Sequence, residues 1–473
     1  MKRLFCMVLI LSLVMGFSGC KNEKEATDAY QGTFRVGFGA ALINPEESVP
    51  LAGYGNTATR MSQNITEDSY IQCVALTDEK ENTVLVFAAD AITTAPYMVD
   101  GLSLVSSELG ISVDNMILNS SHSHSAPDGT NSTVDSSIRY KTLFQERMVI
   151  AAKAAMEDRR PSKMYYGTSE TTGLSFIRHY LLDDGSYGGD SFGDWTNHYA
   201  VQHVAEPDTT IHLLKFTREG MRDIVMMNWR AHAGLTGGAG KALNCSSDFL
   251  GPFRDTLSAM ADCHVMYLQG HAGNINPGSR ISSELNYSDY REHGAKLAEY
   301  AYEAMQDMKE LETGEVKAKH VTLEAKTNHS MDHLATKAAE LSAIWSQTND
   351  RELVIEMGKP YGIRSPYHAN AIKTNAKRPP TEVVEINAIS IGDRVGIVSG
   401  SAELFDRNSM VIEEESPCEV TLCLSYSNGH VGYIPADYVW EYTSYETDTS
   451  RFERGTAELI QKTMLDMLNE LHG

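Results

Sequence analysis

The chain has 473 residues, of which 42% are hydrophobic and 22% are charged, and its formal net charge is −23. This composition excludes collagen-like, coiled-coil and disordered chains and is typical of a globular protein. The strongly acidic balance argues against nucleic acid as a partner and against broad adhesion to anionic membrane surfaces.

The chain begins with a segment typical of export signals. A short basic start precedes an apolar stretch at 4–17, which is too short to span a bilayer as a permanent helix. The stretch ends in the letters FSGC, which resemble a bacterial lipobox, although phenylalanine stands where leucine is usual. We therefore predict a lipoprotein signal peptide at 1–19 and lipidation at Cys20. A plain secretory signal with an incidental cysteine is the alternative.

The residues that follow the signal predict how the protein is attached to the membrane. Residues 20–31 are polar and are expected to form a lipidated tether, so that the membrane is contacted through the N-terminal lipid anchor. This places the protein in the bacterial cell envelope, with the outer membrane as the expected site and the face of the membrane left open.

The remaining cysteines bear on metal binding. Five widely spaced cysteines besides Cys20 allow one disulfide, but they form no CxxC pair that would suggest a thiolate zinc site. Any metal is therefore expected on histidine, carboxylate or phenolate ligands.

Short apolar strands alternate with amphipathic helices across residues 32–473, which are expected to form one domain. We expect strands at 83–89, 115–118, 211–216, 223–228, 264–268, 384–391 and 394–399 and helices at 99–109, 141–158, 290–311, 335–349 and 451–471. The segment 330–380 is the least regular and is a candidate cap or insertion over the site. This alternation predicts a single mixed α/β sandwich with functional groups on loops at strand ends.

Two histidines come directly after the expected strand at 115–118. His122 and His124 are two residues apart, and in an extended segment such residues point to the same face, so both imidazoles can enter one pocket. From the residues alone, the two histidines are explained either as a metal site or as a hydrogen-bonded pair without a metal.

Three further segments place candidate groups at similar junctions. His232 follows an apolar strand and precedes glycines, whereas Glu403 lies where a strand runs into a small-residue turn. Alone, Glu403 is equally explained as an acid at a helix N-terminus. An aromatic cluster follows and could instead be a carbohydrate-stacking surface; its members are Tyr433, Tyr438, Trp440, Tyr442 and Tyr445.

The order of these segments resembles the neutral (alkaline, non-lysosomal) ceramidase family, specifically its N-terminal catalytic domain. The resemblance covers roughly residues 34–460 and rests on the blocks VGFGAALINP, PLAGYG, VLVFAAD, NSSHSHSAPDG, NWRAHAG, SSDF, QGHAGNINPG, SGSAELF and SNGHVGYIPADYVWEYTSYE. HSHSAPDG is the most specific of them. The family's C-terminal immunoglobulin-like domain is expected to have no counterpart in this sequence.

The resemblance implies a zinc hydrolase. Carried over position by position, it implies one Zn²⁺ ion bound by His122, His232, Glu403 and Tyr433. Two imidazoles, a carboxylate and a phenolate suit this ion. The resemblance further implies attack by a zinc-bound water, a substrate-polarising role for His124 and a contact between Tyr445 and the scissile group.

One loop departs from the family. Ceramidases have a motif of the form GDVSP where this chain has GNINP, so Asn276 replaces the serine and Asn274 replaces the acid. Asparagine cannot form an acyl-enzyme, so a mechanism that needs the serine would leave this protein inactive. If zinc-activated water suffices, Asn276 is expected in a catalytic hydrogen-bonding role and Asn274 in substrate binding. Arg178, in SFIRHY, is a further candidate for holding a polar or anionic substrate group.

Three functions follow from these patterns. The first is a zinc-dependent hydrolase that cleaves an amide (N-acyl) or related bond in a small-molecule or lipid substrate. The second is an envelope hydrolase that acts on a polar, glycan-derived substrate. The third is a non-catalytic binding lipoprotein that contains the metal, and the complete ligand set argues against it. The sequence leaves the substrate and the oligomeric state open.

Overall fold

The computed structural model describes residues 30–54, 59–238 and 240–472. The expected signal peptide and Cys20 lie outside these residues, so lipid anchoring stays a prediction. Within the described ranges, no helix combines the length and the apolar character that a bilayer crossing requires. The five cysteines of the described ranges are free thiols, so the disulfide that the sequence allowed does not form among them.

Two β-sheets form the centre of the molecule. The larger sheet has nine strands, ordered β14 (Cys263–Gln269), β12 (Asp223–Trp229), β11 (Thr210–Arg218), β6 (Arg160–Glu170), β1 (Arg35–Leu42), β3 (Tyr70–Thr77), β4 (Thr83–Ala89) and β5 (Met116–Ser120), with β16 (Lys309–Leu311) beside β6. The smaller sheet has four strands, ordered β17 (Val316–Lys326), β18 (Thr381–Ile391), β19 (Val395–Gly400) and β21 (Val420–Leu424).

The two sheets pack face to face through one buried apolar cluster. Val86 and Ile117 of the larger sheet belong to the same cluster as Ile389, Ile397 and Leu422 of the smaller sheet. Because side chains alternate between the two faces of a strand, the opposite faces of both sheets remain to be covered by helices. The expected α/β sandwich is therefore confirmed.

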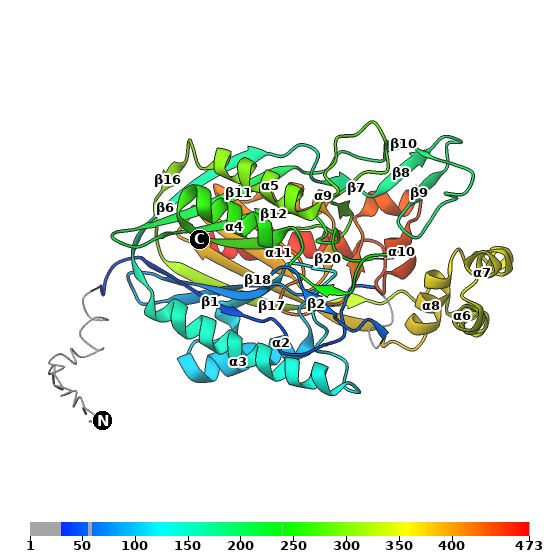
Figure 1. The fold of residues 1–473 in the computed structure, drawn as a ribbon, viewed down its shortest axis with the longest axis horizontal. Helices are drawn as coiled ribbons and strands as arrows, with labels where there is room; N and C mark the ends of the chain where they lie inside the picture. The colour runs from blue at the N-terminus through cyan, green and yellow to red at the C-terminus, as the bar shows by residue number, and fades with distance from the viewer. Residues whose placement is uncertain (1–29, 55–58, 239, 473) are drawn as a thin grey trace, which may run out of the picture.

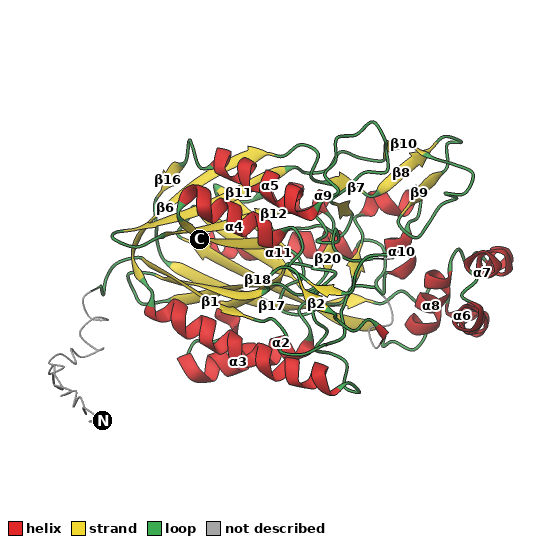
Figure 2. Cartoon of the chain, in the orientation of Figure 1, coloured by secondary structure: helices red, strands yellow, loops and turns green. Residues whose placement is uncertain are grey.

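Helices cover the outer faces on different sides of the molecule (Figure 1, Figure 2). Four helices pack on the larger sheet, namely α2 (Pro96–Leu109), α3 (Asp135–Glu157), α4 (Leu250–Ala261) and α5 (Tyr290–Ala304). Two helices cover the smaller sheet, α9 (Asp406–Glu415) and α11 (Thr456–His472). The contact of α3 with β1 is close, since a Cβ on Gly39 would lie 2.1 Å from the carbonyl oxygen of Ala151. Glycine in β1 therefore allows the helix to approach the sheet.

The segment 330–380 is more regular than the sequence predicted. Besides α6 (Ala335–Thr348) it contains α7 (Arg351–Gly358) and α8 (Pro366–Asn375), which together enclose a small apolar cluster of their own. These three helices extend from one end of the sandwich (Figure 1). The two additional helices are short, with eight and ten residues, so their apolar periodicity is weak in the sequence.

Three expected helix boundaries were wrong. The helix expected at 141–158 begins earlier, at Asp135. The helix expected at 290–311 ends at Ala304, because the chain turns there to form β16 along β6. The closing helix begins at Thr456 rather than at 451. The residues before it instead bridge to the end of β17, where Thr327 pairs with Phe452.

Several short elements complete the molecule near one end of the sandwich. They are β2 (Asn64–Ile65), β7 (Phe176–Ile177), β8 (His179–Leu182), β9 (Tyr187–Gly189), β10 (Ala200–His203), β13 (Asn244–Cys245), β15 (Ile275–Asn276), β20 (Glu403–Leu404), β22 (Tyr433–Ile434) and α10 (Tyr445–Thr449). The candidate site residues lie on or beside these elements.

Candidate metal centre

The candidate site lies where parallel strands of both sheets end. The pairs β4–β5, β12–β14 and β19–β21 are parallel, and the loops after their carboxyl ends carry the candidate groups. Asn119 ties three of these ends together. Its Nδ2 donates to the carbonyl oxygens of Gln269 (3.2 Å) and Ser425 (2.6 Å), and its Oδ1 accepts from the backbone N–H of Gln269 (2.7 Å). Loops that are far apart in the sequence therefore meet.

His122 is held in an unusual backbone conformation. Its φ is +63°, in the left-handed region that residues other than glycine rarely adopt. The carbonyl of Ile92 accepts a hydrogen bond from Nδ1 at 2.6 Å, and the ring stacks on Tyr426 with centroids 4.2 Å apart. The sequence predicted that an extended backbone would direct this ring and that of His124 to the same face, and that conformation was wrong. A left-handed turn at His122 instead brings the two rings together, with their Nε2 atoms 3.1 Å apart.

His232 is oriented in the same way from the loop after β12. Its Nδ1 lies 3.0 Å from the carbonyl oxygens of both Ala272 and Ile275, which can only accept a hydrogen bond. The lone pair is therefore on Nε2 in His232, as it is in His122. Fixing the tautomer through a backbone carbonyl is typical of histidines that ligate metals.

Glu403 brings a buried carboxylate to these rings. Its Oε1 accepts from Nε2 of His430 at 3.1 Å, whereas its Oε2 lies 3.6 Å from Nε2 of His122 and 3.9 Å from Nε2 of His232. Within the described part of the chain, this Oε2 is buried and has no hydrogen-bond partner. An unpaired buried carboxylate oxygen is costly unless a cation is nearby.

The third histidine joins the group more closely than the resemblance implied. The ligand atoms of His122, His124 and His232 lie within 4.8 Å of one another, and such a group could hold a metal ion. His124 also packs against Tyr54, with ring centroids 4.9 Å apart. The structure thus brings together three imidazoles and one carboxylate.

The electrostatics favour ligands that are free of protons. Burial lowers the pKa of His122 and His232 well below the usual value and lowers that of His124 to about 4. Burial opposes ionisation of Glu403, but the nearby His122 ring and the hydrogen bond from His430 outweigh it and hold its pKa at about 2. At neutral pH the site therefore presents neutral imidazoles and a carboxylate, which are the protonation states that bind metals.

Tyr433 is placed beside the carboxylate by strand pairing. The short strands β20 and β22 run parallel, and Glu403 is opposite Tyr433 in their register. The ring of Tyr433 lies edge-on to that of Tyr445, with centroids 5.8 Å apart. Both tyrosines that the resemblance singled out are therefore near the carboxylate.

Arg178 lies against the same group. Its Nη1 donates to Nε2 of His232 at 3.2 Å, and its guanidinium lies 5.2 Å from the ring centroid of Tyr433. Glu446 pairs with this buried guanidinium and also bonds Nε2 of His179 at 2.8 Å. Sequence reasoning missed Glu446, His179 and His430; the only signal was their position inside the blocks SFIRHY, TSYE and SNGHVGY.

The two loop asparagines do not point into this group. Asn274 is buried and donates to Asp406 (2.7 Å) and to the hydroxyl of Tyr438 (3.3 Å). Asn276 donates to Asp190 at 2.7 Å. Their predicted roles in catalysis and substrate binding stay predictions, while the structure gives both a part in holding the loop.

A cavity of about 280 Å³ adjoins the candidate ligands. Glu403, Tyr433 and Tyr445 line one side, and α8 with the residues just after it lines the other. The wall from α8 is polar, since it contributes Asn370, Thr374, Asn375 and Arg378 together with Tyr367.

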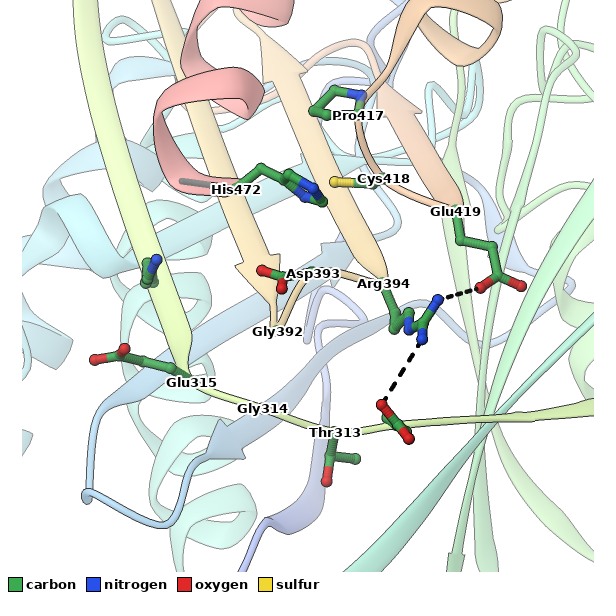
Figure 3. Close-up of a pocket in the computed structure, with 12 residues that line it drawn as sticks. Thr313, Gly314, Glu315, Gly392, Asp393, Arg394, Pro417, Cys418, Glu419 and His472 are labelled. Atoms are coloured by element: carbon green, nitrogen blue, oxygen red, sulfur yellow. Dashed lines mark hydrogen bonds and ion pairs between the residues drawn. The ribbon is translucent and has the colours of Figure 1, made fainter.

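A larger cavity of about 740 Å³ lies at the opposite edge of the smaller sheet, where β17 and β19 begin (Figure 3). Arg394 pairs there with Glu419 at 3.2 Å and with Glu312 at 3.7 Å. The residues that line this cavity include none of the predicted site residues. Size alone therefore does not locate the site.

Comparisons with known proteins agree with this arrangement at the level of the fold. No protein-family model matches the chain, and no curated protein does. Solved structures do match, among them a ceramidase complexed with C2, with a TM-score of 0.70, and the neutral ceramidase from Pseudomonas aeruginosa, with a TM-score of 0.68. Each is 16% identical and covers 93% of this chain, and the chain covers 75% and 74% of theirs. This protein therefore has the fold of the neutral ceramidases, as the sequence resemblance predicted.

Proposed function

We propose that the protein is a zinc-dependent hydrolase that cleaves an amide (N-acyl) bond. The observation that carries the proposal is the unpaired buried Oε2 of Glu403 beside the inward-facing Nε2 atoms of His122 and His232. The ceramidase fold supports the same class of reaction. Ceramidases act on lipid amides, so a lipid or another small N-acyl compound is the substrate we infer.

The donor set fits zinc. Two neutral imidazoles and one carboxylate are the protein ligands of many catalytic zinc sites, and Tyr433 beside Glu403 would supply a further oxygen. Bound zinc acidifies water and polarises a substrate carbonyl. In our proposal His122, His232, Glu403 and Tyr433 hold the ion.

The neighbouring side chains orient the substrate. His124, with its pKa lowered to about 4 by burial, is neutral at pH 7 and can donate one hydrogen bond to the acyl oxygen. Arg178 is fixed by Glu446 and so presents its charge without losing further side-chain freedom on binding. Tyr445 lines the cavity that adjoins the candidate ligands, and its ring lies against that of Tyr433.

A substrate panel tests the proposal. Zinc-loaded protein is incubated with a short-chain N-acyl sphingosine, an N-acyl amino acid and an N-acylated amino sugar, and the released amine is measured. We expect turnover of at least one amide, loss of turnover after chelation, and no turnover by His122→Ala. A protein that binds zinc but hydrolyses none of these amides would instead support the non-catalytic binding lipoprotein.

The polar wall contributed by α8 favours a hydrophilic substrate as the second candidate. Asn370, Thr374 and Arg378 face the same cavity as the candidate ligands, and such groups stabilise polar parts of a ligand rather than an alkyl chain. Turnover of the acylated sugar without turnover of the lipid amide would support this candidate.

The lipid anchor at Cys20 and the cell-envelope location belong to the same proposal. Metabolic labelling with a fatty acid is expected to mark the wild-type chain and to leave Cys20→Ala unlabelled. Equal labelling of both chains, or of neither, would contradict the anchor.

A further inference from the structure

Two arginines line the cavity beside the candidate metal centre. Arg378 lies just after α8, and Arg451 lies just after α10, so they reach the cavity from different elements. A Cβ built on Gly432, next to Tyr433, would lie 3.9 Å from Nη2 of Arg451. The guanidinium of Arg451 is therefore close to the strand that carries a proposed ligand.

The two guanidinium groups share one carboxylate. Glu382 accepts from Nη1 of Arg378 at 2.6 Å and from Nη1 of Arg451 at 3.2 Å. Because both cations bond to this one carboxylate, they lie close enough to repel each other, and burial and the charge of Arg378 lower the pKa of Arg451. The pair therefore keeps an excess positive charge, in a chain whose net charge is −23.

With the proposed zinc ion bound to Glu403, the other charged groups of this cavity do not cancel that excess. Among the described residues that line the cavity, the only carboxylate is Glu403, and it faces the histidines. Because the bonds to Glu382 use Nη1, the Nη2 groups can direct donors to a ligand. A planar guanidinium suits a carboxylate particularly well.

The size of the cavity limits what can occupy it. About 280 Å³ lies just below the range for small-molecule sites, roughly 300–1,000 Å³. An amino-acid-sized group fits this volume, whereas a long alkyl chain would have to extend out of it. Asn370 and Thr374 add polar groups on the same wall.

We propose that Arg378 and Arg451 bind a carboxylate on the amine side of the scissile bond, so that the substrates are N-acyl amino acids. This inference rests on the proposed amide hydrolysis and adds a substrate class to it. Water adds across the amide, the carbon–nitrogen bond breaks, and the products are a fatty acid and a free amino acid.

The first test compares two substrates that differ only in charge. N-lauroylglycine carries the carboxylate, and N-lauroylglycinamide replaces it with a neutral amide. With the zinc-loaded full chain, we expect kcat/KM at least about tenfold higher for N-lauroylglycine. In Arg451→Gln and in Arg378→Gln this preference should fall toward unity. Arg394→Gln removes an arginine from the opposite edge of the sheet and should keep the preference.

The second test does not depend on turnover. Calorimetry measures binding of a non-cleavable analogue of N-lauroylglycine, in which a methylene replaces the amide nitrogen, and of the matching carboxamide. We expect the acid to bind at least about tenfold more tightly, and Arg451→Lys to retain part of this difference because it keeps the charge.

The two tests separate the inference from the proposed function. Equal hydrolysis of both substrates together with equal binding of both analogues would overturn the carboxylate site and leave amide hydrolysis standing. Absence of hydrolysis, with tighter binding of the acid that requires both arginines, would overturn the hydrolase and support the carboxylate site. Thermal unfolding of each variant shows whether loss of a Glu382 partner has unfolded the chain.

Discussion

The two edges of the smaller sheet differ in how their polar groups are satisfied. At the edge where β17 and β19 begin, the larger cavity is bordered by exposed charges that pair with each other, such as Arg394 with Glu419. At the edge where β19 and β21 end, the groups are buried, an oxygen of Glu403 has no partner among the described residues, and His122 has a left-handed backbone. The smaller cavity lies at this second edge.

This difference shows what marks a site in this molecule. Exposed ion pairs contribute little and place no demand on a ligand. A buried carboxylate oxygen without a hydrogen-bond partner is costly, and a bound cation removes that cost. The unpaired buried oxygen of Glu403 therefore identifies the site better than the volume of a cavity does.

The largest expected effect comes from removing a proposed ligand. His232→Ala should lower zinc content to background and hydrolysis by at least about a thousandfold, equivalent to about 4 kcal/mol, because the lost imidazole opens the coordination sphere. Metal analysis and the amide assay measure the two effects. Arg394→Ala, at the opposite edge, should change neither, and equal losses in both variants would remove the distinction between the edges.

Breaking a buried ion pair should have the next largest effect. Glu446→Gln leaves the charge of Arg178 without its carboxylate partner. The pair is buried, since the side chain of Arg178 is 5% exposed and that of Glu446 is 1% exposed. We expect a loss of about 3 kcal/mol or more in the free energy of unfolding, measured in urea. Glu419→Gln breaks the ion pairs with Arg394 and Lys309, whose shared carboxylate is 29% exposed, and should cost about 1 kcal/mol or less. Similar costs for the two variants would contradict the comparison.

Acid should weaken the buried edge through His271, which follows β14. Burial lowers its pKa from 6.5 to about 3. Below pH 6.5 the imidazole therefore binds a proton in the unfolded chain, whereas in the folded chain it binds one only near pH 3. The free energy of unfolding consequently falls as the pH falls from 6.5 toward 3. At pH 5 this loss amounts to about 2 kcal/mol.

His271→Leu should remove that loss from the difference between unfolding free energies at pH 7 and pH 5. His472→Gln is the control, because this partly exposed histidine lines the opposite cavity. If both variants show the pH dependence of the wild type, His271 does not carry the acid sensitivity.

The smallest expected effect concerns the loop that departs from the family pattern. Asn276→Ser shortens the side chain that donates to Asp190, and Arg280 still pairs with that carboxylate. We expect a loss of about 1 kcal/mol in stability. We also expect a higher rate on neutral lipid amides relative to N-acyl amino acids, because the serine restores the ceramidase pattern. An unchanged ratio of rates would show that this loop does not set specificity.

Much of the fold could be predicted because its strands are short apolar runs. The strand expected at 83–89 matches β4, and the convergence of His122, His232 and Glu403 follows from the rule that parallel strands end at the same edge. These features depend on local pattern and on a general rule of topology.

Other features depend on contacts between distant segments and could not be predicted in this way. The pairing of Arg178 with Glu446 joins residues 268 positions apart, and no local signal links them. The left-handed turn at His122 is stabilised by Ile92 and Tyr426, which lie in other loops. The wall from α8 was missed because its short helix carries mixed polar and apolar residues.

Anomalous diffraction at the zinc edge, from crystals of the zinc-soaked protein, tests the central claim most directly. We expect one peak at about 2.0–2.2 Å from Nε2 of His122, Nε2 of His232 and a carboxylate oxygen of Glu403. Absence of a peak at these atoms, or a peak in the cavity beside Arg394 instead, would contradict the proposed metal centre.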